Sequence, residues 1–114
     1  MRHTPLSGGD GEPNYTALEV TAEVTLELEV LKGRRAGWPR IEDEDYIMTV
    51  GSTRPLMDCV CLAQMELLRW LVEEYGFKRE DAWQLNSQIG TMRIGNVVGP
   101  CYTVVAKFPK EYLP

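Results

Sequence analysis

The feature that most constrains the fold is an unbroken alternation of apolar and polar residues over positions 18–30. The even positions are apolar: Leu18, Val20, Ala22, Val24, Leu26, Leu28 and Val30. The odd positions between them are Thr or Glu. A repeat of two places alternate residues on opposite faces of a β-strand. The segment therefore predicts a strand with one buried face, and its acidic face is expected in solvent, as is common in antiparallel sheets.

The remaining elements follow from periodicity and turn residues. A short strand is expected over 46–50, ending at Gly51, after a charged loop over 32–45. Ser52 or Thr53 is expected to cap a helix over 55–75, because Pro55 suits a first helical turn and Gly76 suits a stop. A shorter helix ends at Gly90, and two strands over 91–99 and 101–108 follow. The order β-β-α-α-β-β predicts an α/β chain of the α+β type with antiparallel strands.

Length and composition bound the class of protein. A chain of 114 residues is one domain's worth, so we expect an irregular segment over 1–15 and a single α+β domain over 16–114. The net charge of −5 lacks the basic surplus that binds nucleic acid. No apolar run has the length of a membrane span or the pattern of a signal peptide. We therefore expect no nucleic-acid partner, no membrane association and a cytoplasmic location.

The long helix is unusually apolar. One face carries Leu56, Val60, Ala63, Leu67 and Trp70, and the apolar arc is widened by Met57, Cys61, Leu68 and Leu71. The polar ridge is limited to Asp58, Glu66, Arg69 and Glu73. Such a helix is expected to be buried on more than one side, by its own sheet and by a second subunit or another domain. In the shorter helix Ala82, Trp83 and Leu85 are expected to face inward.

The spacing of Cys59 and Cys61 does not suit joint binding of one metal ion, and the chain has three cysteines in all. Cys59 and Cys61 are two residues apart in the helical pattern, which places them roughly 200° apart around the helix axis. We expect reduced, packed thiols.

Several fixed spacings together resemble the C-terminal portion of the acetamidase/formamidase family. The stretch "GDGEPNYTALEVTAEVTL" over 9–26 matches a family pattern Gly-Asp-Gly-Glu, three variable residues, Thr-Ala-Ile/Leu-Glu and then Ala-Glu-Val-Thr-Leu. A Trp-Pro-Arg loop, "MTVGS", "EDAWQLNSQIG", "MRIGNVVGP" and "AKFPK" follow in the family's order. The resemblance covers nearly the whole chain from Gly9 to Lys110.

The resemblance implies a hydrolase of the C–N bond in small linear amides such as formamide or acetamide. It also implies a bound divalent metal, with zinc favoured, and a larger β-rich amidase fold whose N-terminal part is missing here. The resemblance further implies a full-length enzyme two to three times longer than this chain. Without that part the chain is expected to be inactive.

The resemblance assigns roles to three acids. Glu12 is expected to be the general base and proton shuttle, Asp10 a metal ligand or an orienting group, and Glu19 a supporting hydrogen-bond acceptor. For each of them a solvated turn or strand carboxylate is the alternative. Asp10 and Glu12 alone make a poor metal cage, because catalytic zinc normally has three protein ligands.

Some positions depart from the family pattern. Pro5 stands at a histidine position and Gly8 at a glutamine position, while His3 is the single histidine of the chain. Downstream, Thr91 stands at an aspartate position and Asn96 at a glutamine position. These changes are expected to alter the supporting hydrogen bonds.

Three functions remain open from the sequence. The first is the C-terminal part of an amide hydrolase, whose partners are a small linear amide and the missing amidase domain. The second is a non-catalytic module that forms a homo-oligomer through the long helix. The third is a small protein that binds a metal or ligand through Asp10, Glu12 and groups of a partner subunit.

Overall fold

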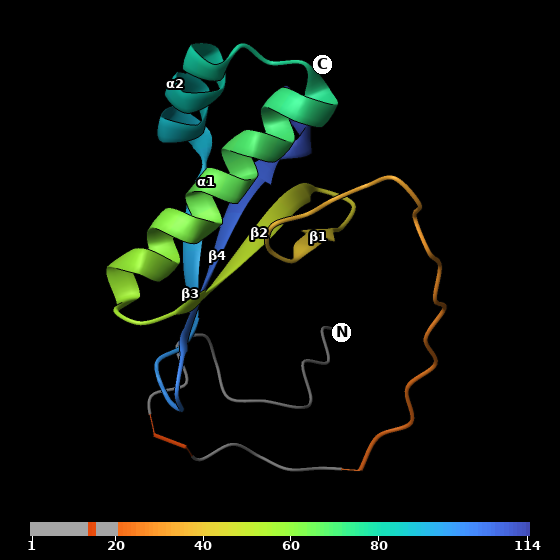
Figure 1. The fold of residues 1–114 in the computed structure, drawn as a ribbon, viewed down its shortest axis with the longest axis vertical. Coiled ribbons are helices and arrows are strands. Elements are labelled where there is room, and N and C mark those ends of the chain that lie inside the picture. The colour runs from red at the N-terminus through yellow and green to blue at the C-terminus, as the bar shows by residue number, and fades with distance from the viewer. Residues whose placement is uncertain (1–13, 16–20) are drawn as a thin grey trace.

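A computed structural model describes residues 14–15 and 21–114. These residues form one antiparallel sheet of four strands with two helices (Figure 1). The elements in chain order are β1 (Arg40–Glu42), β2 (Tyr46–Thr53), α1 (Leu56–Tyr75), α2 (Arg79–Ile89), β3 (Thr91–Asn96), β4 (Tyr102–Pro109) and the 3-10 helix η1 (Lys110–Tyr112). The strands lie in the spatial order β1-β2-β4-β3. The α+β class and the order β-β-α-α-β-β are thus confirmed.

The core lies between α1 and the two central strands. Alternate residues of β2 and β4 are buried, among them Ile47, Val104 and Phe108. They face a buried stripe on α1 that consists of Cys59, Ala63, Leu67, Trp70 and Leu71. The period of two in the strands and the period of 3.6 in the helix bring these two faces together.

The contact between α1 and β2 is very close. A Cβ atom on Gly51 would lie 2.3 Å from the Cys59 carbonyl oxygen, so only glycine lets the helix backbone approach the strand here. One turn away, the Thr49 hydroxyl donates to the Ala63 carbonyl at 2.6 Å. This hydrogen bond satisfies a buried hydroxyl and fixes the helix on the sheet.

The ends of α1 confirm one sequence expectation and correct another. Gly76 ends the helix in the left-handed region with φ 72°, a conformation that favours glycine, and the Phe77 N–H donates to the Leu71 carbonyl at 3.3 Å. At the other end Pro55 precedes the helix without a side-chain cap. Ser52 and Thr53 belong to β2 instead, so the predicted cap is wrong.

The strand predicted over 18–30 is not formed in its described part. Residues 21–30 are extended but exposed and outside the sheet, and Figure 1 shows this segment running far out from the strands. β1 is the first strand of the observed order. A strand needs a neighbour for its backbone hydrogen bonds, and among the described residues none lies alongside this segment.

Three side-chain expectations for the helices also need correction. Glu66, a member of the predicted polar ridge, is buried at 1% exposure. Trp83 is 60% exposed, whereas Ala82 is buried and Leu85 packs partly against the core. Cys59 is buried, but Cys61 and Cys101 are exposed, and all three are free thiols. No helix within residues 14–15 and 21–114 has the length and apolarity needed to cross a membrane.

Candidate functional site

The three acids predicted for catalysis fall outside the described residues. Asp10, Glu12 and Glu19 all belong to 1–13 or 16–20, as does His3. The described residues nearest to them in sequence are Asn14, Tyr15 and Thr21.

Tyr15 contacts the turn between β3 and β4. Its phenolic oxygen accepts a hydrogen bond from the Gly99 N–H at 2.8 Å. Gly99 has φ 77°, a conformation that favours glycine, and its carbonyl accepts a hydrogen bond from the Arg54 guanidinium. Arg54 also lies 4.6 Å from the centroid of the Tyr102 ring, within cation–π range. We call Tyr15, Arg54, Gly99 and Tyr102 the turn cluster.

The turn cluster was not predicted from the sequence. Arg54 directly precedes Pro55, and nothing in its local pattern points to a partner 45 residues away. The cluster joins the end of β2, the start of β4 and the residue three positions after Glu12. It is the described site closest in sequence to the predicted catalytic motif.

The described residues do not form a metal site. No group of three or more His, Cys, Asp and Glu side chains that could hold a metal ion occurs among residues 14–15 and 21–114.

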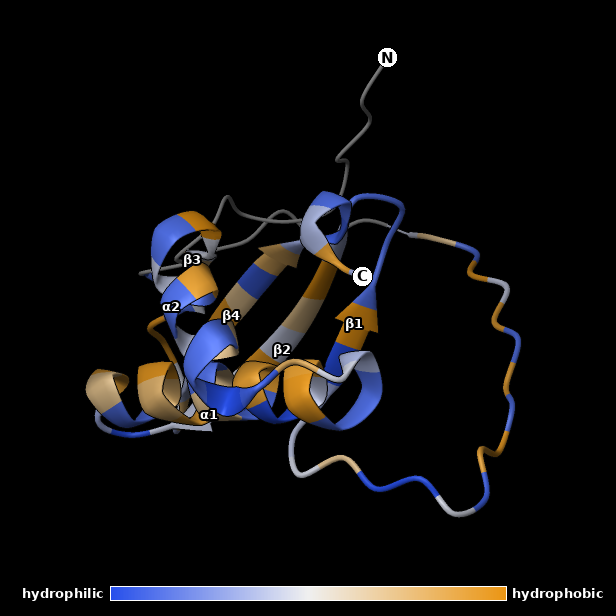
Figure 2. Ribbon diagram, turned by 90° about the horizontal axis from the view of Figure 1, so that it is seen from above, coloured by the Kyte–Doolittle hydropathy of each residue, from blue (hydrophilic) through white to orange (hydrophobic). Residues whose placement is uncertain are grey.

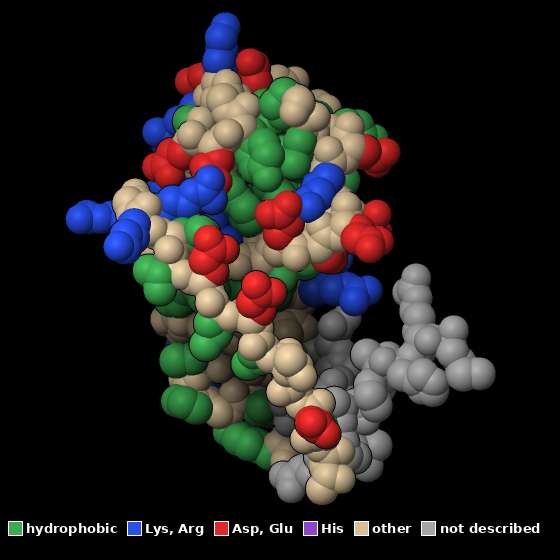
Figure 3. All heavy atoms as spheres, turned by 90° about the vertical axis from the view of Figure 1, so that its right-hand side faces the viewer, with side chains coloured by type: hydrophobic (Ala, Val, Ile, Leu, Met, Phe, Trp, Pro, Cys, Tyr) green, Lys and Arg blue, Asp and Glu red, His purple; other side chains and the backbone are tan. Residues whose placement is uncertain are grey.

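A buried carboxylate, Glu66, joins α1 to the segment before β1. It accepts from Arg40 Nε at 2.8 Å, from Arg69 at 2.8 Å and from the Gly37 N–H at 3.3 Å. Arg40 continues to Glu74 at 2.7 Å, and its guanidinium lies 5.1 Å from the Trp70 ring centroid. Acidic and basic side chains gather in the upper half of the face drawn in Figure 3. Both Glu66 oxygens are occupied by donors, so this network fixes structure and leaves no free base.

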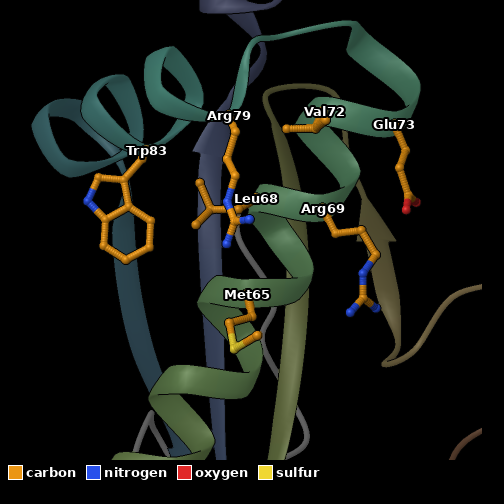
Figure 4. Close-up of a pocket in the computed structure, with 7 residues that line it drawn as sticks. All are labelled: Met65, Leu68, Arg69, Val72, Glu73, Arg79 and Trp83. Atoms are coloured by element: carbon orange, nitrogen blue, oxygen red, sulfur yellow. The ribbon is translucent and has the colours of Figure 1, made fainter.

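A groove lies between α1 and α2 (Figure 4). It encloses about 300 Å³, and its apolar lining is Met65, Leu68, Val72 and Trp83. Three charged side chains, Arg69, Glu73 and Arg79, complete it. Figure 4 shows Arg79 reaching down between Trp83 and α1, while Arg69 points to the far side of the helix.

A second hollow of about 330 Å³ is also lined by Trp83. Asn86 donates to Gln64 at 2.6 Å there, and its own Oδ1 is buried with no hydrogen-bond partner among the described residues. The two hollows share Leu68 and Trp83. Together they combine an apolar contact surface with the charged side chains of Arg69, Glu73 and Arg79.

Comparison with solved structures decides the family. An acetamidase from Yersinia enterocolitica matches 74% of this chain at 45% sequence identity with a TM-score of 0.72. The chain belongs to the acetamidase/formamidase family. An acetamidase from Bacillus halodurans shares the fold over 65% of the chain, with 22% identity and a TM-score of 0.61.

The family relationship is partial in length. The chain spans about a quarter of these acetamidases, 26% of the first and 25% of the second. No protein-family model matches the sequence, and no curated protein does. The family resemblance inferred from the sequence motifs is confirmed by the solved structures.

Proposed function

We propose that this chain is one segment of an enzyme that hydrolyses the C–N bond of small linear amides, of the formamide or acetamide type, in the cytoplasm. The observation that supports the proposal is the 45% identity to an acetamidase over 74% of the chain. Identity of this level over a common fold favours a shared role in a larger amidase. The proposal includes dependence on the rest of that enzyme, because the chain spans 26% of the relative.

The chemistry of amide hydrolysis supports this dependence. The reaction needs a nucleophile, a group that polarises the carbonyl and an acid that protonates the leaving amine. None of these is assembled within the described residues. We assign the proton transfer to Glu12, an orienting or metal-binding role to Asp10 and a supporting hydrogen bond to Glu19. A divalent metal, zinc in our proposal, would need ligands supplied by the remainder of the enzyme.

Ammonia release tests the proposed function. The chain alone is expected to release no ammonia from formamide or acetamide above the buffer blank. Co-expression with the Yersinia acetamidase from which the matched segment has been removed, here called the truncated acetamidase, is expected to give turnover. Glu12→Gln should abolish that turnover while the complex still forms. A complex that forms and releases no ammonia from either amide would contradict the proposal.

We also propose that the chain self-associates through the outer face of α1. Met57 is 65% exposed and Met65 58% exposed on this face, and Trp83 of α2 lies beside it. Exposed apolar patches of this kind mark protein contacts in many soluble proteins. Light scattering at micromolar concentration should give a mass above 13.0 kDa. Met57→Lys with Met65→Lys should restore the monomer mass, and a monomeric parent chain would contradict the proposal.

A further inference from the structure

Residues 21–31 have the alternating sequence of a β-strand, but no described strand pairs with them and no described helix covers them. Every one of these residues is exposed. The apolar side chains reach high exposure: Val24 71%, Leu26 75%, Leu28 90%, Val30 82% and Leu31 57%. Figure 2 shows hydrophobic and hydrophilic residues alternating along this segment, which runs outside the body of the protein.

In an extended conformation this segment would have one apolar face and one polar face, as a strand added to a sheet edge would have. Ala22, Val24, Leu26, Leu28 and Val30 fall on one face of an extended chain, and Thr21, Glu23, Thr25, Glu27 and Glu29 on the other. β-branched residues and the extended backbone favour a strand over a helix. A strand of this kind would bury its first face and leave its acidic face in solvent or beside basic side chains.

The four-stranded sheet formed by the described residues has no edge that matches this segment. The edge nearest in sequence is β1, which has three residues, Arg40–Glu42, against eleven in the segment. The other edge, β3, has six residues and an irregular register between Ile94 and Asn96. α1 already covers the apolar face of β2 and β4. A strand of eleven residues therefore needs a longer edge and a second apolar surface.

We propose that residues 21–31 form a β-strand that adds to a sheet edge in the remaining three quarters of the amidase. The proposal rests on the proposed function, because the partner is the part of the enzyme that this chain does not span. The chain covers 26% of the Yersinia acetamidase, so about three quarters of such an enzyme lies outside the match and can supply the edge. Backbone hydrogen bonds would give affinity, and the apolar face would fix the register.

The test measures the segment inside a complex. The full 114-residue chain is co-expressed with the truncated acetamidase, and the complex is analysed by amide hydrogen exchange. Exchange at residues 21–31 should be at least 100-fold slower in the complex than in the free chain. A complex in which these amides exchange as fast as in the free chain would overturn the inference, and so would the absence of any complex.

Paired variants separate the two faces of the strand. Leu26→Glu with Leu28→Glu changes the apolar face and should weaken the complex at least 10-fold. Glu27→Gln with Glu29→Gln changes the opposite face of the same strand and should leave affinity within about 2-fold. The four positions are exposed in the free chain, so urea unfolding of the free variants should match the parent. Equal weakening by both pairs would contradict a one-sided strand.

The outcomes for the strand and for the activity are separable. Protection of residues 21–31 without ammonia release would keep the strand and refute the amide hydrolase. Ammonia release with residues 21–31 unprotected would support the amide hydrolase and refute the strand. If the truncated acetamidase is insoluble, a chimera that carries this chain in place of the matched segment allows the same exchange measurement. Protection of the segment in the free chain at high concentration would assign it to a second copy and overturn the proposal.

Discussion

Two segments of this chain both have apolar residues at every second position, but their surroundings differ. In β4, Val104, Ala106 and Phe108 are buried beneath α1, and the strand is paired on both sides, by β2 and by β3. In residues 21–31 the corresponding apolar positions are exposed and no described strand lies beside them. The pattern therefore identifies the face that a strand will bury, but it does not identify the partner that buries it.

β4 and residues 21–31 differ in whether this chain itself provides the neighbouring strands and the covering helix. β4 is flanked by β2 and β3 of the same chain, and α1 covers its apolar face. Each apolar side chain buried this way stabilises the fold by about 1.5–3 kcal/mol. The segment over 21–31 gains none of this in the free chain. Both segments have apolar residues at every second position. They differ in whether neighbouring strands and a covering helix are present.

The largest expected effect compares one side chain from each region. Phe108→Ala should lower the free energy of unfolding by about 4 kcal/mol, because it opens a cavity in the core. Leu28→Ala should change it by less than about 0.5 kcal/mol, because Leu28 is 90% exposed. Urea unfolding of both variants measures the difference. A Leu28→Ala loss similar to that of Phe108→Ala would show that the segment is packed in the free chain.

The next largest effect is expected at Glu66, the buried carboxylate that links α1 to Gly37 and Arg40. Glu66→Ala should cost about 3 kcal/mol, because it leaves Arg40 without its buried partner. Glu73→Ala is the matched control on the same helix, since the Glu73 side chain is 54% exposed, and should cost less than about 1 kcal/mol. Thermal or urea unfolding measures both. Equal losses would refute the special role of Glu66.

A smaller loss is expected at the close approach of α1 to β2. Gly51→Ala should destabilise by about 2 kcal/mol, because its Cβ would meet the Cys59 carbonyl and Ala63 nitrogen of the helix backbone. Gly95→Ala is the control, because a Cβ there would lie 3.5 Å from Thr103, an ordinary contact. Unfolding midpoints near each other for the two variants would contradict this account of the helix–sheet contact.

The smallest expected effect is a pH dependence of the free energy of unfolding, caused by Tyr75 at the end of α1. Burial, with the nearby Glu42 carboxylate, raises the pKa of Tyr75 above its ordinary value of 10.0. The folded state therefore holds this proton more tightly than the unfolded state, so stability should fall as the pH rises above about 10. Tyr75→Phe should flatten that fall by less than about 1.4 kcal/mol per pH unit. Unfolding curves between pH 8 and 11 test it, and an unchanged slope would contradict the shift.

Much of the sheet and of the two helices could be predicted from the sequence alone. Gly76 and the apolar stripe of α1 determine where the helix ends and which face it buries, because these are local properties of the chain. The start of α1 was predicted wrongly, since Ser52 and Thr53 are capping residues by type but pair with Thr103 and Tyr102 in the sheet. Tertiary pairing overrides the local capping preference here.

The candidate site was predictable only in part. Glu66 looked like a surface residue because the cations that neutralise it include Arg40, which lies 26 residues earlier. Arg54 and Gly99 meet across 45 residues for the same reason. The roles of Asp10, Glu12 and Glu19 stay predictions, because these residues lie outside the described part of the chain. Spacing along a sequence shows periodic faces, whereas contacts between distant residues require the fold.

Residue-resolved hydrogen exchange of the isolated 114-residue chain tests the central claim most directly. The account predicts slow exchange for the amides of α1, β2 and β4, and exchange at the rate of an unstructured peptide for residues 21–31. Strong protection of residues 21–31 in the isolated chain, equal to that of β4, would contradict the claim that this segment needs a partner outside the chain.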